Sequence, residues 1–125
     1  MRRSLSIATI VGVLLLSVGF ILYQLSSGVR VKVKNNGAKP IHSVVLHVTG
    51  ESHQLGDIAP GEFARATVSP SGESSLQIDI SEANGNKRRL DVDCYMERGY
   101  VGVIEVALKD GHIDALEERV RPRLY

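Results

Sequence analysis

A long uncharged run near the N-terminus constrains this chain more than any other feature. Residues 5–25, LSIATIVGVLLLSVGFILYQL, contain no charged side chain in 21 positions. At about 1.5 Å per residue, a helix of that length spans about 30 Å, which is the hydrocarbon thickness of a bilayer. The sequence therefore predicts a short basic N-terminus over residues 1–4, a transmembrane helix over residues 5–25, and a water-exposed domain after it.

A cleaved signal peptide is the alternative to a retained anchor. Ser26 and Gly28 are small residues at the −3 and −1 positions for a cut before Val29. The apolar core of a signal peptide is usually about 7–15 residues long, however, and this run is longer. We therefore favour a signal anchor that stays attached, with cleavage as the open alternative.

The basic residues on the two sides of the run bear on its orientation. Arg2 and Arg3 favour a cytoplasmic N-terminus under the positive-inside rule. Arg30, Lys32, Lys34 and Lys39 follow the run and oppose that orientation, but the first three alternate with valines, as on the solvent face of a strand. We expect a single-pass protein of a bacterial cytoplasmic (inner) membrane, with its N-terminus inside and its domain in the periplasm.

Two further features predict contacts at the membrane. Small side chains at Ser4, Ala8 and Gly12 would line one stripe of the helix, where another helix could pack closely. Glycine is common in membrane helices, which is the alternative explanation of that stripe. Arg30, Lys32 and Lys34 are expected on an edge strand, where they could contact anionic lipid headgroups.

The remaining 98 residues, 28–125, are enough for one small domain with one core. They hold all 14 acidic residues and 13 of the 15 basic ones, a net charge of −1. A near-neutral mixed surface gives no electrostatic reason to expect nucleic acid as a partner. With no Trp and only two Phe in the chain, platforms for base stacking are scarce as well.

From Val29 onward the apolar residues recur with a period of two, which predicts strands. Turn signals separate these strands: NNG at 35–37, APGE at 59–62, NGN at 84–86, ERG at 97–99 and DG at 110–111. The APGE signal is that of a type II turn, and NNG is expected to turn because Asn and Gly tolerate positive φ. The pattern predicts a mainly β fold, an immunoglobulin-like β-sandwich of about 7–8 strands over residues 26–121 with a tail at 122–125.

Two segments near the C-terminus carry specific expectations. YVGVIEVAL, residues 100–108, is the most apolar strand and is expected in the interior of a sheet. HIDALEERV, residues 112–120, suits a strand better than a short helix. Its charged end is expected to form a mixed-charge tail: Glu117, Glu118, Arg119, Arg121 and Arg123.

Cys94 is the only cysteine, so the domain must fold without an internal disulfide. Cys94 alternates with Leu90, Val92 and Met96, which predicts a buried structural thiol on the inner face of a strand.

The same residues give a weak case for a metal. Cys94 and Met96 share a face and offer two soft ligands for copper(I). His47 and His53 lie on consecutive predicted strands and could meet across a hairpin. His42 and His47 are an odd number of residues apart, so they are expected on opposite faces.

No catalytic motif accompanies these residues. Asp91 and Asp93 fall on the opposite face from Cys94, and the chain has no GxSxG, Walker or HExxH motif. We expect no enzymatic activity and no cofactor.

The segments LGDIAPGE and GESSLQIDI resemble hairpins of immunoglobulin-like and fibronectin-like modules in bacterial envelope proteins. ERGYVGVIEVALKDGHI resembles the closing strand pair of small single-pass bacterial proteins. The resemblance covers residues 29–120 as a pattern of strands and turns, and it carries over no site residue. With the anchor, it leads us to expect a non-enzymatic accessory protein whose domain binds another envelope protein. An immunity-type protein that neutralises a toxin at the membrane surface and a copper-handling periplasmic domain are the alternatives.

Overall fold

The computed structural model describes residues 28–82 and 84–123, and these residues form eight strands. The strands are β1 (Val29–Asn35), β2 (Ile41–Val48), β3 (Glu51–Ile58), β4 (Phe63–Val68), β5 (Ser74–Ser81), β6 (Lys87–Met96), β7 (Tyr100–Lys109) and β8 (His112–Pro122). The prediction of a mainly β domain with seven or eight short strands is confirmed. The predicted helix over residues 5–25, with Ser4, Ala8 and Gly12, lies outside the described residues. Among the residues described, no helix is long and apolar enough to cross a bilayer.

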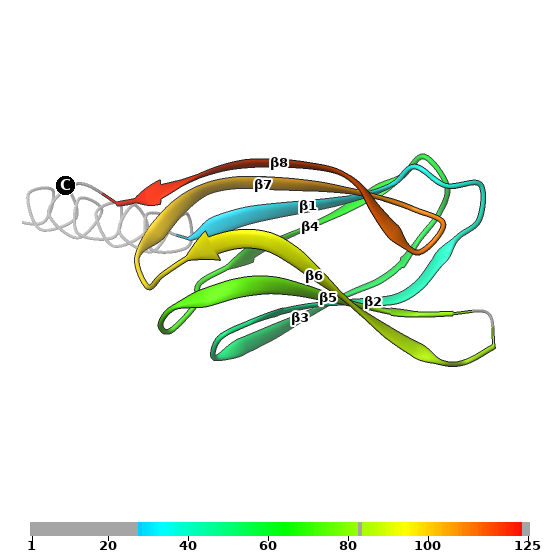
Figure 1. The fold of residues 1–125 in the computed structure, drawn as a ribbon, viewed down its shortest axis with the longest axis horizontal. Helices are drawn as coiled ribbons and strands as arrows, with labels where there is room; N and C mark the ends of the chain where they lie inside the picture. Colours follow the sequence, from blue (N-terminus) through cyan, green and yellow to red (C-terminus); the bar gives the residue numbers. More distant parts are fainter. Residues whose placement is uncertain (1–27, 83, 124–125) are drawn as a thin grey trace, which may run out of the picture.

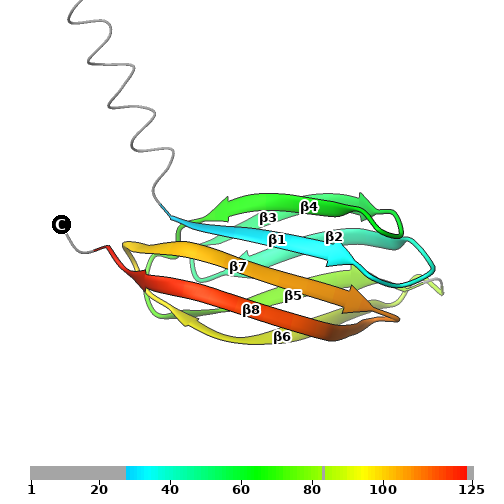
Figure 2. The same ribbon diagram turned by 90° about the horizontal axis from the view of Figure 1, so that it is seen from above.

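The strands form two four-stranded sheets that pack face to face (Figures 1 and 2). Sheet A has the order β4-β1-β7-β8, and sheet B has the order β3-β2-β5-β6. The hairpins β2–β3, β5–β6 and β7–β8 stay within one sheet, whereas the other four connections cross between the sheets. β1 and β7 are parallel, and every other pair of neighbours is antiparallel. The domain is therefore a two-layer sandwich whose layers are tied together by repeated crossings.

The first strand, β1, lies in the interior of sheet A, so the expectation of an edge strand is wrong. β4 crosses over from sheet B and pairs with one side of β1, while β7 pairs with the other. The alternation of Arg30, Lys32 and Lys34 with buried valines correctly places these side chains on the outer face. Alternation shows which face of a strand is buried, but it says nothing about the neighbours along its edges.

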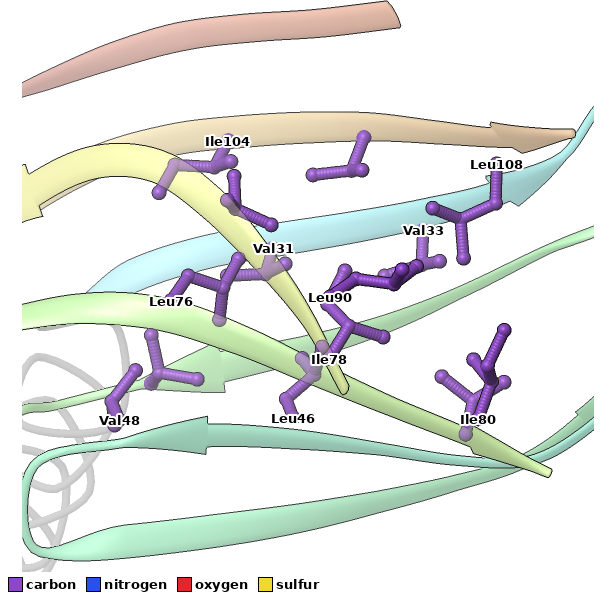
Figure 3. Packing of buried hydrophobic residues seen from close by; sticks show 14 of the residues in the cluster. Val31, Val33, Leu46, Val48, Leu76, Ile78, Ile80, Leu90, Ile104 and Leu108 are labelled. Atoms are coloured by element: carbon purple, nitrogen blue, oxygen red, sulfur yellow. The ribbon is translucent and has the colours of Figure 1, made fainter. Parts of the chain in front are cut away.

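The inner faces of both sheets supply one apolar core. Val31 and Val33 of β1 point toward Leu46 of β2 and toward Leu76 and Ile78 of β5 (Figure 3). All five side chains are at most 1% exposed. On β6 the predicted inner face is also observed: Leu90, Val92 and Met96 are buried, and Cys94 is partly buried against the core. The period-two pattern thus predicted the core because each strand has one side facing the other sheet.

Two predicted turns form as their residues require. Gly61 has a φ of 77°, and the Glu62 amide donates to the Ala59 carbonyl at 3.0 Å, as in a type II turn. Asp110 and Gly111 both have positive φ, 52° and 78°, as in the two-residue hairpin predicted between β7 and β8.

The turn after β1 forms for a different reason than the one predicted. Asn35, Asn36 and Gly37 do not use positive φ. Instead, the Asn35 side chain is 1% exposed and fully hydrogen-bonded at the end of the core. Its Nδ2 donates to the carbonyls of Lys39 at 2.7 Å and Ile58 at 3.0 Å, and its Oδ1 accepts from the Gly37 amide at 2.9 Å. This one side chain joins the β1–β2 turn to the end of β3, and the turn is an Asx-turn.

The C-terminal segments form the outer hairpin of sheet A. YVGVIEVAL lies in β7, between β1 and β8, which confirms its interior position. HIDALEERV is a strand as expected, but its charged end continues in β8 as far as Pro122 instead of forming a tail. Gly102 permits the close approach of β8, because a Cβ there would lie 2.0 Å from the Arg119 carbonyl oxygen. Its φ of 142° is also one that side chains rarely adopt.

Candidate functional site

The most ordered polar arrangement lies on the outer face of sheet B and crosses all four strands. We call Ser52 of β3, His47 of β2, Asp79 of β5 and Arg89 of β6 the polar network. The pairing register places Ser52 directly opposite His47, and Asp79 directly opposite Arg89. His47 Nδ1 lies 2.7 Å from the Ser52 hydroxyl, and its Nε2 lies 2.8 Å from Asp79 Oδ2. The four side chains therefore form one continuous chain of hydrogen bonds.

Arg89 fixes the charge at the centre of this network. Its Nε and Nη2 donate to the two oxygens of Asp79 at 2.8 and 3.0 Å, a bidentate pair. The guanidinium, with a smaller contribution from the His47 hydrogen bond, lowers the pKa of Asp79 to about 2 against the opposing effect of partial burial. Asp79 in turn raises the pKa of Arg89. Both ends of this pair stay charged at neutral pH, so the network keeps one arrangement.

The network shares the Ser–His–Asp connectivity of hydrolytic triads, but its electrostatics differ from theirs. In a triad the carboxylate stabilises the imidazolium that forms when histidine accepts the serine proton. Here the Asp79 carboxylate is already paired with Arg89, which reduces the stabilisation it can give to His47. The arrangement favours a fixed pattern of donors and acceptors on a surface over activation of Ser52.

A hollow lies beside the network on the same face of sheet B. It has a volume of about 320 Å³, and its lining includes Val45, Gln54, Asp79 and Lys87. Its lining combines apolar side chains with an amide, a carboxylate and an ammonium group. These groups are suited to contacts with the polar surface of another molecule.

The sequence did not single out Ser52, Asp79 and Arg89. They lie on three strands that are separated along the chain, and only the register of sheet B brings them together. The available signal was the polar face of each strand, such as Gln77 and Asp79 alternating with buried isoleucines in β5. That pattern marks an exposed face, but it does not reveal which residues are paired across strands.

The structure separates the residues considered for copper. His47 pairs with Ser52, and His53 pairs with Leu46, so the two histidines point to opposite faces of sheet B. His53 Nε2 lies 3.2 Å from Glu51 Oε1 on the inner side, near the edge of the sandwich. It has no hydrogen bond of good geometry there, and Glu51 accepts one from the Ser69 amide. In residues 28–82 and 84–123, no three His, Cys, Asp or Glu side chains form a group able to hold a metal ion.

Cys94 and Met96 are on the same side of β6, as predicted, but in different environments. Met96 is 0% exposed, whereas Cys94 is partly buried. Burial, with smaller contributions from the charges of Glu118 and Asp93, raises the pKa of the Cys94 thiol to about 11 against the opposing effect of a hydrogen bond with the Leu76 backbone. A protonated thiol is a weak nucleophile and a weak metal ligand.

A β-bulge overturns the expectation that His42 and His47 lie on opposite faces. The register of β2 shifts between Ile41 and Val44, and Ser43 has a φ of 51°. Both Ile41 and Val44 are buried although they are three residues apart, so His42 and Ser43 share the exposed side. His42 Nδ1 lies 3.3 Å from Asp57 Oδ2 there. The parity rule fails because it assumes an uninterrupted strand.

Each of the four edge strands has a feature that hinders the addition of another strand. β3 turns Glu51 and His53 toward the inner side, and β8 does the same with Glu118, which pairs with buried Ile104. β4 has only 6 residues. β6 is interrupted by a register shift opposite Ser74–Leu76. The faces of the sheets are therefore more accessible to partners than their edges.

The outer face of sheet A has the opposite character to that of sheet B. Arg30, Lys32 and Lys34 of β1 lie beside Phe63 and Arg65 of β4, and we call these five residues the basic face. Lys32 Nζ lies 4.2 Å from the centre of the Phe63 ring, and the Arg65 guanidinium lies 4.7 Å from it. The predicted residues are thus brought together with an aromatic ring and a fourth cation.

Comparison with known proteins gave no match: no protein-family model, characterised protein or solved structure matches this chain.

Proposed function

We propose that this chain is a non-enzymatic interaction protein held in a bacterial cytoplasmic membrane, with its sandwich in the periplasm. The uncharged run over residues 5–25 supports the anchor. We also propose that the sandwich is an immunoglobulin-like module, because such modules consist of two packed antiparallel sheets and this domain has two packed four-stranded sheets. In this proposal the sandwich binds another envelope protein through the outer face of sheet B.

The polar network is the observation that carries the proposal. Four side chains from four strands are held in one hydrogen-bonded arrangement, and the Asp79 side chain is only 21% exposed. A surface that is already ordered loses little side-chain entropy when a partner binds. The adjoining hollow of about 320 Å³ gives a protruding side chain of the partner a place to bind beside the network.

Site-specific photo-crosslinking in intact cells tests the binding face. A photoreactive residue replaces Gln54 or Ser75, which flank the network on sheet B, or the exposed Thr67 on sheet A as a matched control. We expect one specific protein adduct from the two sheet B positions and none from Thr67. The adduct should weaken at least tenfold when Asp79→Asn disrupts the network. A strong adduct from Thr67 alone, or one indifferent to Asp79→Asn, would contradict the proposed face.

The orientation needs an independent test. Alkaline phosphatase fused after Tyr125 should be active, because that enzyme requires the oxidising periplasm for its disulfides. A fusion at Arg3, before the apolar run, is the matched control and should be inactive. An inactive fusion at the C-terminus would place the sandwich in the cytoplasm and contradict the proposed location.

A further inference from the structure

The cations of the basic face lie together on two neighbouring strands without any carboxylate among them. The outward positions of β1 are Arg30, Lys32 and Lys34, and those of β4 are Phe63, Arg65 and Thr67. The register places Lys32 beside Arg65, and Lys34 beside Phe63. Across the rows that β1 spans, the other half of sheet A adds Arg119, Glu105, Glu117 and the exposed bulge residue Asp114 as charged groups. Five cations thus face three carboxylates, a net charge of +2.

These cations have no carboxylate partner among the described residues: none of Arg30, Lys32, Lys34 and Arg65 forms an ion pair there. By contrast, Arg119 on the same sheet pairs with Glu117 at 2.6 Å, and Arg89 on sheet B is tied to Asp79. A cluster of unpaired like charges repels itself, and an external anionic surface would relieve that repulsion.

Phe63 gives the basic face an apolar centre. Phe63 is 45% exposed, and Lys32 Nζ and the Arg65 guanidinium lie 4.2 and 4.7 Å from the centre of its ring. An exposed aromatic ring surrounded by cations suits the boundary between phospholipid headgroups and acyl chains. A polyanion without apolar or aromatic groups would give the ring nothing to contact.

The connection to the apolar run places this face near a membrane. Only Ser26 and Ser27 separate Leu25 from Gly28, so Gly28 lies within about 10 Å of the end of the run along the chain. Strand β1 begins at Val29 and carries three of the four cations. At about 3.3 Å per residue, Lys34 lies about 13 Å beyond Arg30 along the strand. That is more than the screening length of about 8 Å at physiological salt, so an upright sandwich would leave Lys34 out of reach of the headgroups.

We propose that the basic face docks on the anionic headgroups of the membrane that holds the apolar run. The sandwich then lies on its side, with sheet A against the lipid and the outer face of sheet B toward the water. The inference rests on the anchor of the proposed function but not on its protein partner. It explains why the cations are gathered on the strand that leaves the membrane, and it leaves the polar network accessible.

Labelling of the full chain in vesicles tests this docking. In a Cys94→Ser background, a single cysteine replaces Thr67 on sheet A or Gln54 on sheet B, and each carries a fluorophore. The vesicles contain either phosphatidylcholine alone or phosphatidylcholine with 30 mol% phosphatidylglycerol. We expect the label at 67 to become at least fivefold less accessible to an aqueous quencher on the anionic vesicles, and to regain accessibility in 0.5 M NaCl. The label at 54 should stay accessible in both.

A pair of charge reversals with a matched control identifies the surface responsible. Lys34→Glu with Arg65→Glu should reduce the docking equilibrium at least about 25-fold, since each basic residue near an anionic surface strengthens binding about fivefold. Lys39→Glu with Lys87→Glu changes the net charge equally at exposed positions away from the face and should leave docking unchanged. Thermal unfolding of both double variants verifies that they are folded.

Each outcome decides between specific alternatives. Equal accessibility of the label at 67 in both lipids would overturn the docking, while flotation of the chain with the vesicles would still support the anchor. Failure to float with either lipid would overturn the anchor itself. Shielding that follows the protein-to-lipid ratio instead of lipid charge would identify a second copy of the chain as the occupant and would also overturn lipid docking.

Discussion

The two outer faces of the sandwich hold their charges in opposite ways. On sheet B, Arg89 is paired with Asp79, and the pair is joined to two further side chains by hydrogen bonds. On sheet A, Lys34 and Arg30 have no carboxylate partner among the described residues. The two strand patterns look alike in sequence, since both alternate apolar and charged residues. The difference teaches that pairing across strands, not composition, decides whether a polar face is satisfied internally or remains open to an external partner.

The buried Asn35 joins the end of β1 in sheet A to the end of β3 in sheet B. Its loss should therefore reduce the stability of the domain more than any other change considered below. Asn35→Ala leaves the carbonyls of Lys39 and Ile58 without their donor and should reduce the free energy of unfolding by about 3 kcal/mol. Urea unfolding of the full chain in detergent measures this loss. The control is Asn36→Ala, whose side chain makes only a 3.4 Å exposed contact with Asp114 and should change stability by less than about 0.5 kcal/mol. Similar losses for the two variants would contradict the assigned role of Asn35.

The next largest loss of stability should be confined to one of the two sheets. Gly102→Ala places a Cβ against the β8 backbone in a strained conformation and should cost about 2 kcal/mol. Hydrogen exchange should accelerate at the β7–β8 amides and change little in β2 and β5. Gly72→Ala is the control, because nothing lies within 4 Å of a Cβ there. Uniform acceleration in both sheets would show that sheet A has no independent local opening.

Asp79→Asn should have a smaller effect, confined to sheet B. It removes the charge paired with Arg89, and at this partly exposed site we expect a loss of about 1 kcal/mol at pH 7. The folded-state pKa of Asp79, about 2, lies below its usual value of 3.8. The stabilisation by Asp79 is therefore fully present above about pH 4 and is lost as the pH falls toward 2. Unfolding measured from pH 6 to pH 2 should show this loss in the unaltered chain, and a smaller loss in Asp79→Asn.

The smallest effect should come from a single cation of the basic face. Lys34→Gln removes one of several like charges, so stability should stay within about 0.5 kcal/mol and rise slightly at low salt. The same type of change at Arg89, Arg89→Gln, should instead destabilise the chain, because Arg89 has a partner. Thermal unfolding at 10 mM and 500 mM NaCl compares the two variants. If both variants changed the stability in the same direction, the proposed difference between the unpaired cations of sheet A and the paired Arg89 of sheet B would be wrong.

Much of the fold was predictable because period-two alternation is local. The buried side of β6 and the turn at Asp110-Gly111 each depend on residues within one short segment. The position of β1 was not predictable in this way, because its neighbours β4 and β7 are distant in sequence. The polar network was missed for the same reason. The bulge at Ser43 and the buried Asn35 were missed because each depends on a tertiary contact that no local pattern encodes.

The parallel pairing of β1 with β7 also determines how the sandwich responds to mechanical force. A pull on the chain before Gly28 acts along β1, which is hydrogen-bonded on both sides from Val29 to Lys34. When the opposing load acts at the far end of the sandwich, such a pull shears two ladders at once, whereas a pull across the open end of a hairpin would break its bonds one after another. Under that load, the strand that continues from the apolar run cannot be peeled away bond by bond.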